Sequence, residues 1–112
     1  MVRTNIFRLQ GDDWVLNGWF DPDLADRFDE ATRLVGLDCV SVLTADPAQH
    51  QTLYRTPENR WVLHRWSQWE GEADAYEFVD PPEARIWLLT CHHDAAVEEH
   101  FGPLPDEAGP NL

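Results

Sequence analysis

The chain has 112 residues, of which 43% are hydrophobic and 12% aromatic, and its formal net charge is −13. A chain of this length buries about 60 to 70% of its unfolded surface, which is enough for one hydrophobic core, and its aromatic content excludes an intrinsically disordered protein. The charge excludes a nucleic-acid or membrane surface of the usual basic type, because an acidic field repels phosphate and anionic lipid. We therefore expect a single folded domain that favours a basic partner.

The expected cellular compartment follows from the lack of sequence signals for secretion, membrane insertion or disulfide bonding. Residues 1–14 contain no continuous apolar segment of the kind found in secretory signals, and no apolar run approaches the ~18 to 20 residues that span a bilayer. Cys39 and Cys91 are too few for a disulfide framework. We expect a cytoplasmic protein without membrane contact. The basic residues are all arginine, so solubility or adaptation of the source organism is an alternative explanation for the acidity.

Two segments of the chain, 6–20 and 53–67, align without gaps. Trp14 matches Trp61 in this alignment, and a second pair of tryptophans is also in register. Each segment predicts a β-hairpin, because β-prone residues flank a short polar turn. The match indicates an internal duplication, with two generic hairpins of similar composition as the alternative.

A helix is predicted after each hairpin. The pairs Asp21-Pro22 and Asp80-Pro81 each place a capping residue before a proline at the first helical position. The first helix is expected to end at Gly36, and a final helix is expected from a cap at Asp94 to Gly102-Pro103. Apolar residues recur at helical spacing in the first of these helices: Leu24, Phe28, Ala31 and Val35.

Further strands are predicted at 38–44 and at 76–79. The expected order is ββαβ for the first half, 4–45, followed by βββαα for the second half, 51–104. Consecutive hairpins favour antiparallel pairing, so the predicted fold is α+β, an antiparallel sheet with helices on one face. We expect one domain over 1–104 and a flexible tail over 105–112, which is polar and rich in glycine and proline.

The second half carries a series of short motifs. They are Leu53-Tyr54-Arg55-Thr56, Trp61-Val62-Leu63, Trp66-Ser67-Gln68-Trp69-Glu70-Gly71, Tyr76-Glu77, Glu83-Ala84 with Trp87-Leu88, and Glu99 with Phe101-Gly102. This pattern resembles one in small bacterial proteins that are often encoded near phage or plasmid genes. That family has no assigned chemistry, so the resemblance implies an origin in the accessory genome and no mechanism. It covers somewhat less than half of the chain, and the first half lacks the WSQW bend.

The run Cys91-His92-His93-Asp94 contains residue types that bind zinc. Adjacent ligands on one short loop rarely converge on a single ion, and no Cys-x-x-Cys or His-x-x-x-His spacing is present. We therefore assign no metal, no cofactor and no catalytic residue. A small metal-dependent or thiol hydrolase that uses Cys91, His92 and His93 is the alternative function.

A third reading is a DNA-binding protein that inserts a sheet into the major groove. Arg55, Arg60 and Arg65 lie in the appropriate region of the sequence. They would have to overcome the net charge of the whole chain, and they are equally suited to pairing with carboxylates or to covering tryptophans.

The favoured reading is a non-enzymatic module that binds a basic protein surface, such as that of a nucleic-acid-binding protein. An inhibitor, an antitoxin or a phage anti-defence protein would act in this way, and a DNA mimic is physically allowed because helical carboxylates one turn apart match phosphate spacing. A homodimer is compatible with the sequence. The candidate binding residues combine a tryptophan with carboxylates: Trp69, Glu70, Glu72, Asp74, Asp94, Glu98 and Glu99. Trp61 and Trp66 are expected in the core, and Trp69 is left open between a core position and an exposed one.

Overall fold

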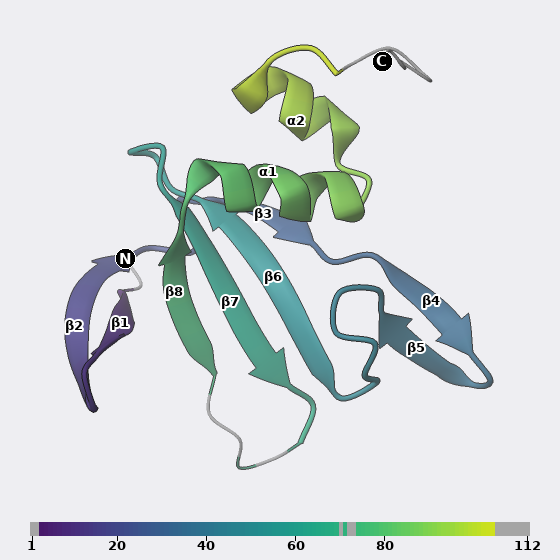
Figure 1. Ribbon diagram of the computed structural model, residues 1–112, viewed down its shortest axis with the longest axis horizontal. Helices are drawn as coiled ribbons and strands as arrows, with labels where there is room; N and C mark the ends of the chain where they lie inside the picture. Colours follow the sequence, from purple (N-terminus) through teal and green to yellow (C-terminus); the bar gives the residue numbers. More distant parts are fainter. Residues whose placement is uncertain (1–2, 70, 72–73, 105–112) are drawn as a thin grey trace.

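A computed structural model describes residues 3–69, 71 and 74–104, in which the chain forms eight strands and two helices. The centre is an antiparallel sheet with the strand order β3, β6, β7, β8 (Figure 1). The bounds of these strands are Asp26–Asp29, Gln49–Arg55, Trp61–Ser67 and Ala75–Val79. The fold is therefore α+β with antiparallel pairing, as the sequence predicts.

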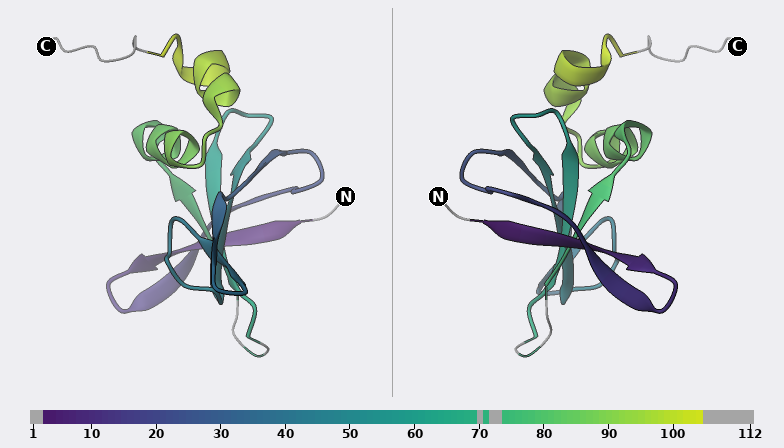
Figure 2. Two further views of the ribbon diagram at one scale, coloured as in Figure 1. Left: turned by 90° about the vertical axis from the view of Figure 1, so that its right-hand side faces the viewer. Right: turned by 90° about the vertical axis from the view of Figure 1, so that its left-hand side faces the viewer.

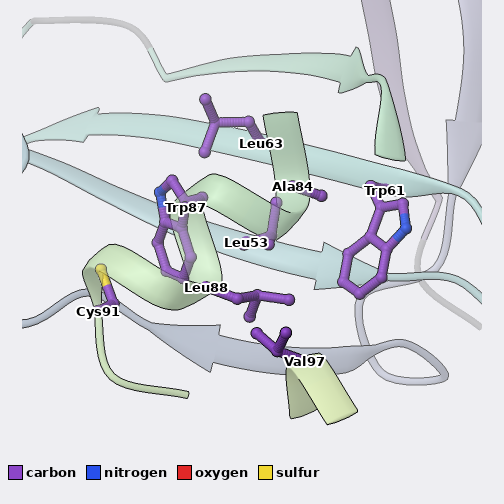
Figure 3. Close-up of a cluster of buried hydrophobic side chains, with 8 residues drawn as sticks. All are labelled: Leu53, Trp61, Leu63, Ala84, Trp87, Leu88, Cys91 and Val97. Carbon is purple, nitrogen blue, oxygen red and sulfur yellow. The ribbon is translucent and has the colours of Figure 1, made fainter. Parts of the chain in front are cut away.

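Two helices, α1 (Pro81–Thr90) and α2 (Asp94–Phe101), cover one face of this sheet. The main core lies between them and the sheet (Figure 3). It contains Leu53, Trp61, Leu63, Ala84, Trp87, Leu88, Cys91 and Val97. Full burial of a leucine or valine side chain stabilises the fold by about 1.5 to 3 kcal/mol. The second half follows the predicted order βββαα.

The helix starts differ in detail from the predicted caps. Asp80 occupies the N-cap position of α1 in an extended conformation, but its side chain makes no capping hydrogen bond. The N-cap of α2 is His93, and Asp94 lies in the first turn, where its charge is favourable to the helix dipole. The predicted end of α2 is confirmed, since Gly102 has a φ of 95° that suits glycine.

The opposite face of the sheet carries a hairpin made of β1 (Thr4–Gln10) and β2 (Asp13–Phe20). Ile6 and Phe20 from this hairpin pack on Tyr54 and Val62, which alternate along their strands with the residues that face the helices. Figure 2 shows the hairpin at a steep angle to the strands of the sheet. Gly18 permits this close approach, because a Cβ atom there would lie 3.0 Å from the ring of Phe78.

The helix predicted from Asp21 to Gly36 is wrong. Asp21 accepts a hydrogen bond from the amide of Asp23 at 3.0 Å and so closes a turn in place of a helix cap. The chain then forms β3, β4 (Thr32–Val35) and β5 (Asp38–Ser41). The edge of β6 is free to accept β3, with Phe28 opposite Leu53, and this tertiary pairing overrides the helical spacing of the apolar residues. Gly36 takes a left-handed φ of 64° in the turn of the β4 and β5 hairpin.

The two predicted halves are therefore not alike as folded units. The first half contains β1 to β5 and no helix among its described residues, so the order ββαβ is wrong. Both matched segments form antiparallel hairpins, but Trp61 is 5% exposed in the main core whereas Trp14 is 69% exposed. The predicted tail, 105–112, lies outside the described residues. No helix in the described part of the chain is long and apolar enough to cross a membrane.

Candidate functional site

The β1 and β2 hairpin has a second face that points away from the core and carries large apolar side chains. Cross-strand pairing puts Phe7 opposite Leu16, and Leu9 opposite Trp14, on this side. Asn17 is an extra residue in β2, and the bulge that it forms shifts the alternation of side chains by one position. Trp19, opposite Asn5, therefore lies on the same side as Leu16. We call this surface the hairpin face, and it consists of Phe7, Leu9, Trp14, Leu16 and Trp19. These side chains are between 45% and 69% exposed, which is unusual for a contiguous group of this size.

The hairpin face was not among the sites predicted from sequence. Its signal is present nonetheless, since β2 carries large apolar residues on both faces and β1 places Ile6 on one face and Phe7 and Leu9 on the other. A two-stranded hairpin with one covered face leaves the other to solvent or to a partner. β7 also carries apolar residues on both faces, and there the helices cover one face and the hairpin covers part of the other.

An open cavity of about 590 Å³ lies between the hairpin and the adjacent strand β8. β1 runs beside β8 in Figure 1, and the two strands are not hydrogen-bonded into one sheet. The lining is mainly apolar, with Phe7 and Trp14 from the hairpin face and Tyr76 from β8. The carboxylate-bearing residue of the lining is Asp74, and Thr4, Asn5 and Ala75 complete it. We call this the hairpin cavity.

Asp74 is held in place at the hairpin cavity by its neighbours. Its Oδ2 lies 3.0 Å from Nε2 of His64, and the His64 ring stacks on Tyr76 with centroids 4.2 Å apart and planes 9° from parallel. Burial raises the pKa of the Tyr76 hydroxyl, and the negative charge of Asp74 raises it further. The cavity therefore has a neutral phenol and a positioned carboxylate side by side.

Trp69, whose exposure the sequence left open, is a surface residue with 66% of its area exposed. Its backbone amide donates to Oγ of Ser67 at 3.0 Å, which fixes the chain just beyond the end of β7. Trp69 borders a separate open cavity of about 380 Å³ together with Pro47 and Gln68. Glu70 and Glu72 lie outside the described residues.

The remaining predicted carboxylates, Asp94, Glu98 and Glu99, are exposed on α2. Glu99 Oε2 lies 2.9 Å from Nε2 of His100. In Figure 1, α2 and the end of β7 that precedes Trp69 are at opposite ends of the molecule. The structure thus does not bring the α2 carboxylates together with Trp69 and Asp74, and Trp69 and Asp74 border different cavities.

Two residues of the hydrolase alternative, Cys91 and His93, take part in packing and hydrogen bonding within the fold. Burial raises the pKa of the Cys91 thiol, which disfavours the thiolate that a nucleophile needs. Nε2 of His93 lies 2.7 Å from the carbonyl oxygen of Asp29, and its ring stacks on Trp87. Cys39, by contrast, is exposed. The described residues contain no group of three or more His, Cys, Asp and Glu side chains arranged to hold a metal ion.

The arginines of the DNA-binding alternative also have partners within the chain. Arg55 lies over the ring of Trp61 at 5.9 Å, and Arg60 lies over Phe78 at 3.7 Å. Arg65 forms an ion pair with Glu77. These guanidinium groups cover aromatic rings or neutralise a carboxylate. The sequence allowed both roles as alternatives to DNA binding.

No family model matches this chain, and neither a curated protein nor a solved structure matches it significantly. The resemblance of the second half to accessory-genome proteins therefore stays a prediction. Any function must be argued from the residues and their geometry.

Proposed function

We propose that this protein is an acidic protein-binding module that docks a basic partner through the hairpin face. The observation that carries the proposal is the exposure of five large apolar side chains on one side of β1 and β2. Exposed apolar groups of this kind, next to polar residues, are typical of protein interaction sites. An inhibitor or an antitoxin would act in this way without chemistry of its own.

Charge specifies the kind of partner. Asp12 and Asp13 lie at the tip of the hairpin and Asp74 lies at its side, in a chain whose net charge is −13. A basic protein approaching this surface would be steered by the field and would then bury the apolar residues. Association should therefore be fast and sensitive to salt, whereas dissociation should depend on the apolar contacts.

Affinity capture from a lysate of the source organism tests the proposal with two matched double variants. Leu9→Ser with Leu16→Ser removes apolar groups from the hairpin face. Leu34→Ser with Leu37→Ser removes two leucines that are even more exposed from the β4 and β5 hairpin and serves as the control. All three proteins should be equally stable, because each replaced side chain is already exposed to water.

We expect the unmodified protein and the control to capture the same basic protein, with less recovered at high salt. The hairpin-face variant should bind that protein about tenfold more weakly or worse, since interface anchors each contribute on the order of 1 to 2 kcal/mol. Equal capture by the two double variants would contradict the proposal, and so would a captured partner that is acidic.

A further inference from the structure

We propose that the hairpin cavity binds the cationic side chain of a lysine or arginine presented by the partner. This inference rests on the function proposed above and specifies what the partner inserts. Three features of the cavity carry it: aromatic residues of three strands in its lining, a positioned carboxylate, and a volume within the range of ligand pockets.

The aromatic lining suits a cation with an apolar stem. Phe7, Trp14 and Tyr76 approach the cavity from three different strands, β1, β2 and β8. The face of an aromatic ring attracts ammonium and guanidinium groups, and several rings around one cavity form the arrangement that recognises organic cations. The volume of about 590 Å³ lies within the roughly 300 to 1,000 Å³ that is typical of ligand sites.

The same preference operates elsewhere on this protein. The guanidinium group of Arg3 lies 5.2 Å from the ring of Trp19 on the hairpin face itself, and Arg60 covers Phe78 beside the hairpin. Among the described residues, no arginine lies over Phe7, Trp14 or Tyr76. The rings of Phe7 and Trp14 are thus not covered by an arginine of the described residues, and one face of the Tyr76 ring is stacked on the His64 imidazole.

Asp74 gives the cavity its charge preference. His64 orients one carboxylate oxygen, Oδ2, and Asp74 lines the cavity next to Tyr76, whose hydroxyl pKa is raised by burial and then by the charge of Asp74. A bound ammonium or guanidinium group would relieve this local excess of negative charge. A neutral apolar side chain would leave it unchanged, so the cavity should select the cation over its neutral analogue.

The probe that tests the inference is Nα-acetyl-lysine methylamide, compared with its Nε-acetylated form, which keeps the stem and loses the charge. Both are titrated into the ¹⁵N-labelled protein while backbone amide shifts are followed. We expect saturable shifts at 4–16 and 74–76 for the charged compound, weakening as salt is added. Equal affinity for the two compounds, or shifts confined to other parts of the chain, would overturn the inference.

Two variants and two matched controls locate the binding. Trp14→Leu and Asp74→Asn should each weaken the charged probe about fivefold, as expected for losing one cation–π or one partly exposed ionic contact. Trp69→Leu removes a tryptophan of similar exposure, and Glu98→Gln removes an exposed carboxylate at the far end of the molecule, so neither should affect the probe. Trp14 is exposed and Asn keeps an oxygen for His64, so both test variants should fold.

The outcome separates this inference from the proposed function. If Leu9→Ser with Leu16→Ser abolishes capture of the partner while Trp14→Leu and Asp74→Asn leave capture and probe binding unchanged, the cavity is not a cation site and the docking surface stands. If the probe binds as expected and the two leucine variants capture partner equally well, the cavity stands and the hairpin face is wrong.

Discussion

The imidazole of His50 and the carboxylate of Glu30 form a buried pair, with Nδ1 of His50 2.5 Å from Oε2 of Glu30. The other carboxylate oxygen accepts the backbone amide of Gln51 at 2.8 Å. Nε2 of His50 lies 3.0 Å from the carbonyl oxygen of Pro47, and Trp66 stacks on the ring. The pair thus connects strand β6 with the segment between β3 and β4. In the predicted helix, Glu30 would not have reached His50.

Glu30→Gln should lower the free energy of unfolding by about 2 to 4 kcal/mol, because a buried imidazole and a buried amide lose a charged acceptor. Urea titration followed by tryptophan fluorescence measures this. The adjacent Asp29→Asn is the control, since Asp29 pairs with Arg27 at the surface and should contribute less than about 1 kcal/mol. Similar losses for the two variants would mean that the buried pair has no special role in stability.

The two cysteines should differ sharply in reactivity toward a thiol reagent. Cys39 is exposed, whereas Cys91 is buried in the main core and burial raises its pKa. At pH 8 the thiol of Cys39 should react rapidly with the reagent, whereas the thiol of Cys91 should react only at the rate at which the protein unfolds. Mass spectrometry of the labelled protein identifies the sites. Rapid labelling of Cys91 in the folded protein would show that α1 opens from the sheet far more easily than the packing indicates.

Tyr76 should make the protein less stable at high pH. Its pKa in the folded state is raised by burial and then by Asp74, so its contribution is fully present below the ordinary tyrosine pKa of about 10 and is lost as the pH rises through and above that value. Thermal melts between pH 8 and pH 11 should show a decline that is smaller in Tyr76→Phe. In Asp74→Asn, absorbance titration of the phenol should give a lower pKa for Tyr76. An unchanged pKa would mean that Asp74 does not act on the hydroxyl.

Trp69→Ala should leave the melting temperature nearly unchanged, because the side chain is mostly exposed and is not part of the main core. Trp61→Ala, a buried tryptophan at the start of β7, should cost about 3 to 5 kcal/mol. If Trp69 also anchors a partner, Trp69→Ala should speed dissociation without loss of stability. A large fall in melting temperature for Trp69→Ala would instead assign this tryptophan a structural role.

Local patterns in the sequence were enough to predict the second half. The hairpin of β6 and β7 has aromatic and apolar residues on both sides of a polar turn, α1 has prolines after Asp80, and α2 has a glycine after Phe101. These elements also pack on one another, so local preference and tertiary packing favour the same result. The α+β fold class follows from them directly.

The stretch from Asp21 to Val35 could be assigned only by the tertiary structure. Its apolar residues have helical spacing, but the edge of β6 needs a partner strand and Glu30 needs His50, and both requirements involve residues that are distant in sequence. The strand pairing and the buried contact between Glu30 and His50 outweigh a weak helical preference. The two matched segments likewise diverge, since the helices cover Trp61 while Trp14 is left on an open face.

The candidate site shows the same division. Sequence alone determined that the protein is acidic and rich in tryptophan and predicted a folded domain, and it placed Asp74 and Trp69 among the candidate binding residues while leaving the exposure of Trp69 open. Whether a tryptophan on a hairpin is buried depends on which face another element covers, and that information is absent from a period-two pattern. Only the packing of β1 and β2 against the sheet decided that Phe7, Trp14 and Tyr76 meet around one cavity with Asp74 beside them.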